Sequence, residues 1–361
     1  MDKEKYKNIL VINLGGIGDF LLSTPALRAL RNRYPQSEIS MLVTTRILRL
    51  VKTLTYIDKV FTFDVSYGGI VPFINYGGIV PFIKLFRYLK LLLKLRRKHF
   101  DLAINMRTLV TRSGARKIKL LLNIINPRKT AGRDTDGRGS FLDTRIPETY
   151  PGKKYEMEYD IDTVNALGAE VKDKNIDFNI DEESINKVDK VLEKEGVSED
   201  DTLIGIHLGG MPSRRWPIDN FSKVIDDINK RISCKFVITG GVDEAGLAKR
   251  LTKIINAKII DLVGKLTIRE LGALIKECNL FITNDTGPMH VAAILRIPLV
   301  AIFGPGDITR FDPRNISDKA IVLYKKVDCA PCEKVECEDL KCLKIILPEE
   351  VKEAIGKLLN I

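Results

Sequence analysis

The stretch ILVINLGGIGDFLLSTPALRAL (residues 9–30) joins an apolar run to a helical pattern through a turn rich in glycine. The run at 9–14 has the length and composition of a buried strand. The helix is expected to begin at the turn, where its N-terminus attracts anions and glycine lets a ligand approach the backbone. A strand, a glycine turn and a helix in this order predict the first unit of a doubly wound α/β fold.

The alternation of strand-like and helix-like runs continues to the end of the chain. In the first half the expected strands are 9–14, 39–43, 59–63 and 102–105. In the second half they are 203–207, 236–239, 280–283 and 298–303, with helices expected at 221–231, 244–254 and 268–276. Such alternation predicts parallel sheets with crossover helices, whose ligands lie beyond the carboxyl ends of the strands.

The length of the chain, 361 residues, exceeds what one hydrophobic core usually serves, so two domains are expected. The polar stretch at 169–201, rich in Asp, Glu and Lys, is the best candidate for the boundary. We therefore predict a first domain at 1–175, a second at 176–346 and a closing helix at 347–361.

Positive charge is concentrated in the first half of the sequence. Lys and Arg exceed Asp and Glu by 58 − 47 = 11 over the whole chain. Residues 1–175 carry 31 basic and 17 acidic side chains (+14), whereas residues 176–361 carry 27 and 30 (−3). This asymmetry indicates an anionic partner for the first half, such as a phosphorylated glycolipid, a membrane surface or nucleic acid. A solvated basic surface is the alternative.

Membrane contact is expected at a surface rather than across the bilayer, in a cytoplasmic protein. No uncharged run reaches the roughly 18 residues of a membrane span, and the apolar run at 9–14 is too short for a signal peptide. The segment YGGIVPFIN (67–75) recurs as YGGIVPFIK (76–84), and a basic amphipathic helix is expected over 84–100. Together they predict a surface that touches lipid. A local duplication beside an ordinary packed helix is the alternative.

The first glycine turn fits a dinucleotide site poorly. Gly16 and Gly18 supply two glycines of the dinucleotide fingerprint, but Leu21 occupies the third position and no carboxylate follows the strand at 39–43 to hold a ribose. Asp19 would repel a pyrophosphate, although the positive end of a helix keeps a carboxylate ionised. Such a carboxylate at the mouth of a parallel sheet can accept a proton from a substrate hydroxyl. Capping of the helix is the alternative.

Two arginines mark a second strand end. Arg214 and Arg215 follow the strand at 203–207 and a pair of glycines. Guanidinium groups in this position can neutralise a diphosphate leaving group. The alternative is a surface pair of arginines beside a buried Trp216.

A third strand end carries the stretch NDTGPMH (284–290), at which a helix is expected to begin. Thr286 and Gly287 can offer a hydroxyl and a backbone N–H to a phosphate at that helix end. Asp285 can bind sugar hydroxyls. His290, one turn into the helix, can face the same ligand or be an ordinary buried histidine.

Six segments together carry a family resemblance: LGGIGDFLLSTPALRAL, RRWPIDNF, TGGVDEAGLAKRL, DLVGKLTIRELGALI, NDTGPMHVAAIL and FGP. In this order, over nearly the whole chain, they resemble glycosyltransferase family 9, the ADP-heptose:lipopolysaccharide heptosyltransferases. The resemblance implies an α/β GT-B fold of two doubly wound Rossmann-like domains that face each other across a cleft, with the acceptor on the first and the sugar nucleotide on the second. It implies an inverting transfer of heptose from ADP-heptose to a lipopolysaccharide core acceptor, without metal or other cofactor.

The resemblance also implies roles for individual residues. Asp19 becomes the general base on the acceptor hydroxyl, in a turn that Gly15, Gly16 and Gly18 open for the acceptor sugar. The implied donor-binding residues are Arg214, Arg215, Glu244, Leu266, Asp285, Thr286, Gly287 and His290. Within that set, Asp285 would hold the transferred sugar, and Glu244 and Leu266 the ribose and adenine.

Two departures from the family pattern leave the substrates open. Arg214 stands where the family usually has lysine, and Gly306 stands where it usually has Thr or Ser. The same fold acting on another nucleotide sugar or surface glycan is therefore the first alternative. A dinucleotide-dependent oxidoreductase is the second, and the missing third glycine argues against it. The third is a non-catalytic nucleic-acid or membrane-binding protein, which has no need for Asp19, Arg214 and Asp285 at three separate strand ends.

The partners we predict are an ADP-sugar donor, a phosphorylated glycolipid acceptor and the cytoplasmic face of the inner membrane, to which the protein attaches peripherally. No nucleic-acid partner is expected.

Four of the six cysteines lie close together near the end of the chain, in the pattern Cys329-x2-Cys332-x4-Cys337-x4-Cys342. The spacing permits a tetrahedral zinc ion or an iron–sulfur cluster. In a cytoplasmic protein, metal or free thiols are expected before disulfides. We expect a structural role for this segment and no metal in the catalytic site. The remaining two cysteines, 234 and 278, are expected to be buried core thiols.

Overall fold

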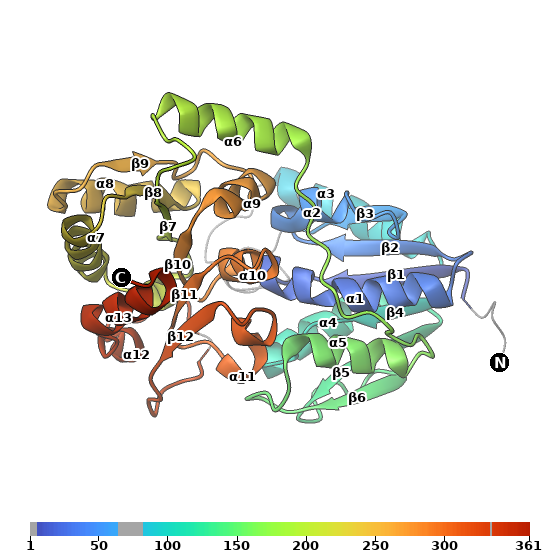
Figure 1. Cartoon of the computed structure of the whole chain (residues 1–361). Coiled ribbons are helices and arrows are strands. Elements are labelled where there is room, and N and C mark those ends of the chain that lie inside the picture. Colours follow the sequence, from blue (N-terminus) through green and yellow to red (C-terminus); the bar gives the residue numbers. More distant parts are fainter. Residues whose placement is uncertain (1–5, 64–81, 333) are drawn as a thin grey trace. The chain divides into compact units, whose positions relative to one another are not determined.

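A computed structural model of the chain describes residues 6–63, 82–332 and 334–361. The chain divides into two compact units, Met1–Asp177 and Phe178–Ile361. Each unit is built on its own six-stranded sheet, and helices flank both sheets (Figure 1). The tandem repeat at 67–84 falls largely outside the described residues, so its predicted lipid contact stays a prediction.

The sheet of the first unit has the strand order β3-β2-β1-β4-β5-β6, and its neighbouring strands all pair in parallel. Its strands are β1 (Asn8–Asn13), β2 (Glu38–Val43), β3 (Lys59–Thr62), β4 (Leu102–Asn105), β5 (Lys129–Thr135) and β6 (Thr144–Glu148). Its helices are α1 (Ile17–Arg33), α2 (Leu48–Val51), α3 (Phe82–Arg96), α4 (Arg112–Ile125) and α5 (Glu156–Asn165). Five consecutive residues of β1 are buried, which requires helices on both faces of the sheet.

Helices α3 and α4 pack their apolar faces against the same hydrophobic core. The core-facing residues of α3 are Leu95, which is fully buried, and its neighbours Tyr88, Leu91 and Leu92. Helix α4 presents Leu121 to the same core. Their spacing of three and four residues is the helical period that the basic segment at 84–100 predicts.

The second unit repeats the architecture in the order β12-β11-β10-β7-β8-β9, again all parallel. Its strands are β7 (Leu203–His207), β8 (Lys235–Thr239), β9 (Ile259–Asp261), β10 (Leu280–Asn284), β11 (Leu299–Phe303) and β12 (Ala320–Tyr324). Its helices are α6 (Glu182–Lys194), α7 (Ile218–Arg231), α8 (Ala245–Ile254), α9 (Ile268–Glu277), α10 (Gly287–Ile294), α11 (Ile308–Phe311), α12 (Lys341–Lys344) and α13 (Pro348–Leu359). The predicted fold class, α/β with two doubly wound sheets, is confirmed.

The eight expected strands and the three expected helices of the second half are present, with ends shifted by at most a few residues. Four strands were not predicted. Three of them, β6, β9 and β12, lie at sheet edges. Strands β6 (TRIPE) and β9 (IID) lack an apolar run, which an edge strand does not need, whereas β12 (AIVLY) is apolar and was overlooked. The fourth, β5, carries Gly132, Arg133 and Asp134 in its middle and therefore does not look like a buried strand.

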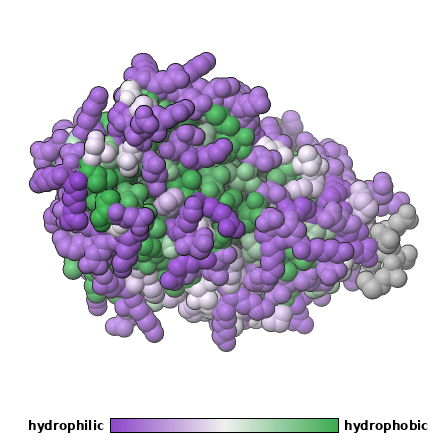
Figure 2. Space-filling view, in the orientation of Figure 1, coloured by the Kyte–Doolittle hydropathy of each residue, from purple (hydrophilic) through white to green (hydrophobic). Residues whose placement is uncertain are grey.

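The helices that the structure describes include none long and apolar enough to cross a membrane. Hydrophilic side chains cover most of the face seen in Figure 2, and apolar residues form patches between them.

Candidate functional site

In the first unit, the carboxyl end of β1 leads into the turn that contains Asp19. Asp19 is the third residue of α1, and its Oδ2 accepts a hydrogen bond of 2.8 Å from the backbone N–H of Gly16. The predicted alternative of helix capping is therefore realised. The side chain nevertheless keeps 28% of its surface exposed, and the guanidinium of Arg107 lies 3.6 Å from the same oxygen. Capping thus leaves the carboxylate accessible.

The glycines of this turn have a steric role. A Cβ on Gly15 would lie 2.6 Å from the Cβ of Asp19 and 2.9 Å from Nη1 of Arg107. Gly15 also donates its backbone N–H to Oδ1 of Asn13 at 3.1 Å, which fixes the end of the strand. Gly18 lies in the first turn of α1 and is buried. The structure therefore brings Gly15, Gly16 and Asp19 together, with Gly18 supporting them from the helix.

A buried network of charges, which the sequence analysis missed, lies in the same unit. Arg133 is fully buried and contacts carboxylate oxygens of Glu148, Glu156 and Asp160 at 3.2, 2.7 and 2.5 Å. Burial raises the pKa of Asp160 to about 7, against the opposing effect of Arg133; the charges of Glu156 and, last, Asp19 add to the rise. The network is thus electrostatically linked to Asp19. Its members come from β5, β6 and α5, so no local sequence pattern reveals it.

In the second unit, the predicted donor residues form two ion pairs. Arg214 ends a short 3-10 turn, Pro212–Arg214, after β7, and its Nη1 lies 2.7 Å from Oδ2 of Asp285. Arg215 places Nη2 at 2.7 Å from Oε1 of Glu244. All four side chains are largely shielded from solvent. The arginines and acids therefore lie together, at the ends of β7, β8 and β10.

Asn284 ties two of these strand ends to each other. Its Oδ1 accepts a hydrogen bond from the backbone N–H of Trp216 at 3.0 Å, and its Nδ2 donates to the carbonyl of Gly209 at 3.0 Å. Trp216 is buried and donates its ring N–H to the carbonyl of Ile346. Trp216 is thus buried, as the alternative interpretation of this segment has it, and the loop of both arginines is held at both ends by Asn284. Asn284 was not among the predicted site residues.

Thr286, Gly287 and His290 lie at the start of α10. Thr286 is its N-cap, and Gly287 is its first residue. His290 is buried, with its ring centroid 6.1 Å from that of Phe311. Gly210 has a φ of +130° and approaches so closely that a Cβ there would lie 2.7 Å from Cγ2 of Thr286. The glycine pair after β7 therefore lets the arginine loop pack against this helix end.

Gly306, in the loop after β11, lies directly against Asp285. A Cβ on this glycine would lie 2.0 Å from Oδ2 of Asp285, the oxygen that pairs with Arg214. A serine or threonine could not occupy the position while Asp285 keeps this place. The two departures from the family pattern, Arg214 and Gly306, thus meet at one carboxylate.

Glu244 and the loop that carries Leu266 lie side by side. Glu244 is buried, and its Oε2 accepts a hydrogen bond from the backbone N–H of Gly241. The N–H of Gly264 donates to the carbonyl of Gly240 at 2.9 Å, which joins the loop after β9 to the turn of Glu244. Leu266 is half-buried in that loop. The two residues predicted to contact the adenosine, Glu244 and Leu266, therefore lie in adjoining loops.

Comparison with known proteins gives a consistent result. The model of the family described as "Glycosyltransferase family 9 (heptosyltransferase)" matches residues 88–343. The lipooligosaccharide heptosyltransferase 2 of Campylobacter jejuni subsp. jejuni serotype O:6 is 35% identical over 43% of this chain and 51% of its own length. This chain thus spans about half the length of that relative.

Two further proteins are similar over almost their whole length. The lipopolysaccharide heptosyltransferase 3 of Escherichia coli strain K12 is 27% identical over 95% of both chains. The solved structure of E. coli ADP-heptose lps heptosyltransferase II is 20% identical over 98% of both chains, with a TM-score of 0.69. At that identity, the structural similarity shows the shared fold.

Proposed function

Because the chain belongs to glycosyltransferase family 9, we propose that it transfers heptose from ADP-heptose to the core of lipopolysaccharide. The observation that carries the proposal is the pair of ion pairs Arg214–Asp285 and Arg215–Glu244 at the carboxyl edge of the second sheet. Two arginines held in place at this edge are suited to a diphosphate, and the acids beside them are suited to sugar hydroxyls.

On donor binding, the two arginine–carboxylate ion pairs would be replaced by contacts with the donor. The phosphates of ADP-heptose accept hydrogen bonds from Arg214 and Arg215, whose charges are balanced by Asp285 and Glu244 in the structure. The carboxylates can then accept hydrogen bonds from hydroxyl groups of heptose and ribose. The Thr286 hydroxyl and the N-terminus of α10 offer further donors to the phosphates.

The acceptor would be activated by Asp19. A hydroxyl oxygen of the lipopolysaccharide core attacks C1 of heptose from the face opposite the diphosphate, and its proton passes to the Asp19 carboxylate. The bond between C1 and the diphosphate oxygen breaks, ADP leaves with that electron pair, and the configuration at C1 is inverted. Arg214 and Arg215 stabilise the charge that develops on the leaving diphosphate.

The first unit would also touch the membrane that holds the acceptor. Helix α3 exposes Phe86, Leu89 and Leu93 by 63%, 52% and 45%, away from its core-facing leucines. The exposed residues around this stripe include Arg87 and Lys90. An apolar stripe with basic flanks is typical of a helix that lies in the interface of an anionic bilayer. This supports peripheral binding to the cytoplasmic face of the inner membrane.

A second candidate is transfer of a different nucleotide sugar by the same residues. It is favoured by the contact between Gly306 and Asp285, because the residue proposed to hold the sugar meets a departure from the family pattern. The shape of the sugar pocket is the property that this contact changes.

A thermal-shift panel with ADP, UDP, GDP, CDP and NAD distinguishes these functions. A ligand that binds only the native state adds about 2.7 kcal/mol of stability at a hundredfold excess over its dissociation constant. We expect selective stabilisation by ADP. Selective stabilisation by UDP or GDP would support the second candidate, and stabilisation by NAD alone would contradict both.

A further inference from the structure

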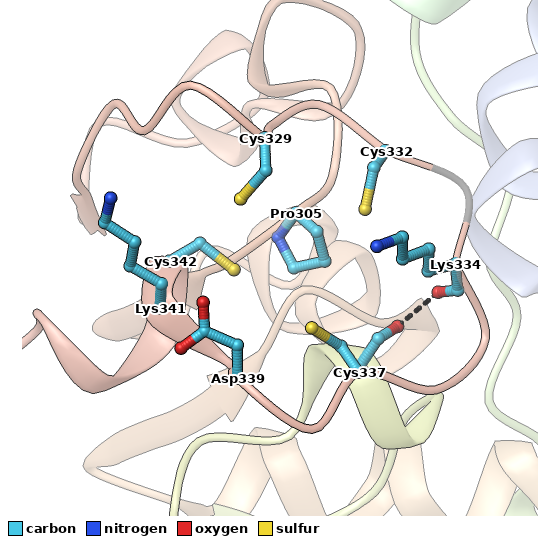
Figure 3. A pocket seen from close by; sticks show the side chains of 9 residues that line it. Pro305, Cys329, Cys332, Lys334, Cys337, Asp339, Lys341 and Cys342 are labelled. Carbon is cyan, nitrogen blue, oxygen red and sulfur yellow. Dashed lines mark hydrogen bonds between the residues drawn. The ribbon is translucent and has the colours of Figure 1, made fainter.

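The four clustered cysteines surround one cavity in the second unit. They lie in the irregular segment between β12 and α13, where the short helix α12 is the regular element described. The cavity has a volume of about 60 Å³. Its lining comprises the four thiols together with Ser213, Pro305, Lys334, Asp339 and Lys341. Figure 3 shows the sulfur atoms directed toward a common space around Pro305.

The chemistry of this lining is that of a soft metal site. Four cysteine thiolates form a tetrahedral donor set that selects zinc or iron. Such a centre carries a net negative charge, since four thiolates outweigh one divalent ion. Lys334 and Lys341 line the same cavity and can offset that charge.

The segment must close around the ion. Among the residues that the structure describes, no three Cys, His, Asp or Glu side chains already form a group that could hold a metal ion. Cys342 is buried in the short helix α12, whereas Cys329 is exposed and Cys332 and Cys337 are half-buried on irregular backbone. The last three can move toward Cys342 without breaking a helix or strand. Metal binding commonly drives local closure of this kind.

We propose that Cys329, Cys332, Cys337 and Cys342 bind one tetrahedral metal ion, zinc or iron. On binding, the four thiols release their protons to the solvent, and the four thiolate electron pairs form the metal–sulfur bonds in place of the water molecules on the ion. No redox change accompanies the step.

The ion would fix the conformation of the two loops assigned to the sugar-nucleotide donor. This effect rests on the proposed function. The backbone N–H of Ser213 donates to the carbonyl of Val335 at 3.0 Å, and Ser213 immediately precedes Arg214. The backbone N–H of Cys332 donates to the carbonyl of Pro305 at 2.9 Å, and Pro305 immediately precedes Gly306. The cysteine segment therefore holds both loops that meet at Asp285. Fixing its conformation fixes theirs.

Metal analysis of the full-length protein, purified without oxygen, tests the site itself. We expect about one equivalent of zinc or iron per chain, with no acid-labile sulfide. The variants Cys329→Ser and Cys337→Ser should lose the metal, whereas Cys234→Ser, outside the cluster, should keep it. Cys329 is exposed, so its replacement is the one least able to disturb folding.

Three results would overturn the site. They are a wild-type protein without metal even after incubation with zinc under reducing conditions, iron accompanied by matching amounts of sulfide, and a disulfide between two of the four cysteines in protein kept reduced. The first leaves free thiols, the second indicates an iron–sulfur cluster and the third a covalent link.

ADP titration of the metal-loaded and metal-free proteins tests whether the ion fixes the donor-binding loops. We expect ADP binding to weaken about tenfold when the metal is removed by a chelator or by Cys329→Ser. Equal affinities would show that the ion does not fix these loops, and the metal site itself would still rest on the measured metal content. If the loaded protein binds no ADP at all, the proposed function fails and the metal site is judged on its stoichiometry alone.

Discussion

Asp19 combines a capping hydrogen bond with an exposed carboxylate surface. Replacing it with asparagine keeps an oxygen that can accept from the Gly16 N–H, so the start of α1 should survive. The amide cannot accept the hydroxyl proton. We therefore expect Asp19→Asn to lower kcat by about a thousandfold and to leave ADP affinity nearly unchanged, measured by initial rates and by calorimetry. Loss of ADP binding would argue against the base assignment.

Arg214 is expected to bind the donor diphosphate. Arg214→Ala should weaken ADP binding by about ten- to a hundredfold, because a charge-assisted hydrogen bond is removed. Arg214→Lys should recover part of the affinity, since the charge returns without the planar guanidinium. Arg250→Ala is the matched control, because Arg250 pairs with Asp219 on the exposed surface. An unchanged dissociation constant for Arg214→Ala, measured by calorimetry, would refute the role.

Gly306 gives a sharper test of the sugar site. A Cβ there would lie 2.0 Å from Oδ2 of Asp285, so Gly306→Ser should displace Asp285 from Arg214. We expect the variant to change KM for the sugar nucleotide more than the affinity for ADP, which lacks the sugar. Gly246→Ser, where an added Cβ meets no atom within 4 Å, serves as the control. If the KM for the sugar nucleotide and the affinity for ADP changed by the same factor, Asp285 would not be a contact of the transferred sugar.

At the scale of single elements, α3 has two faces with different expected roles. Phe86→Glu and Leu89→Glu introduce negative charge into the exposed apolar stripe and leave the core-facing residues in place. Binding to vesicles that contain anionic lipid should fall about tenfold in a flotation assay. Ile254→Glu, at an exposed apolar residue of α8, should bind like the wild type. Equal binding by the wild type and all three variants would indicate that α3 is an ordinary packed helix.

The interior strands could be predicted from sequence because parallel strands buried on both faces read as continuous apolar runs. β1 and β10 are of this kind, and each ends at a turn that the sequence also marks with glycine or proline. The edge strand β6 contains Pro147, and β9 has only three residues, so neither has that pattern. Edge position is set by the completed sheet and leaves little trace in the local sequence.

At the scale of the whole molecule, the site residues fall into two groups: those that lie in a local sequence motif and those that are brought to the site by the pairing of strands. Asp19, Arg214 and Asp285 could be proposed because each follows a strand end within a recognisable motif. Arg107 lies 3.6 Å from Asp19 only because β4 pairs with β1. Asn284 likewise reaches the backbone of Trp216 through the pairing of β10 with β7. Contacts across neighbouring strands depend on sheet order, which the sequence alone does not supply.

Stability should depend on pH through His207, which ends β7. Burial lowers the pKa of His207 to about 4 from its ordinary 6.5, so the folded protein holds the neutral ring. The resulting stabilisation is present above pH 6.5 and is lost as the pH falls toward 4, by at most about 1.4 kcal/mol per pH unit. The raised pKa of Asp160 acts in the opposite direction, with stabilisation lost as the pH rises toward 7.

Denaturant unfolding between pH 4 and pH 7 isolates the histidine contribution. The difference in unfolding free energy between the wild type and His207→Gln should shrink as the pH falls through this range, because glutamine does not titrate. A difference that stays constant would show that His207 is not buried in its neutral form.

The central claim is heptosyl transfer with Asp19 as the base, and one assay tests it most directly. ADP-heptose and a heptose-deficient lipopolysaccharide core are incubated with the wild-type protein or with Asp19→Asn, and the product is read by mass spectrometry. We predict that the wild type adds one heptose and releases ADP, and that the variant binds ADP but forms the product about a thousandfold more slowly. Transfer by Asp19→Asn at the wild-type rate, or no transfer by the wild type, would contradict the account.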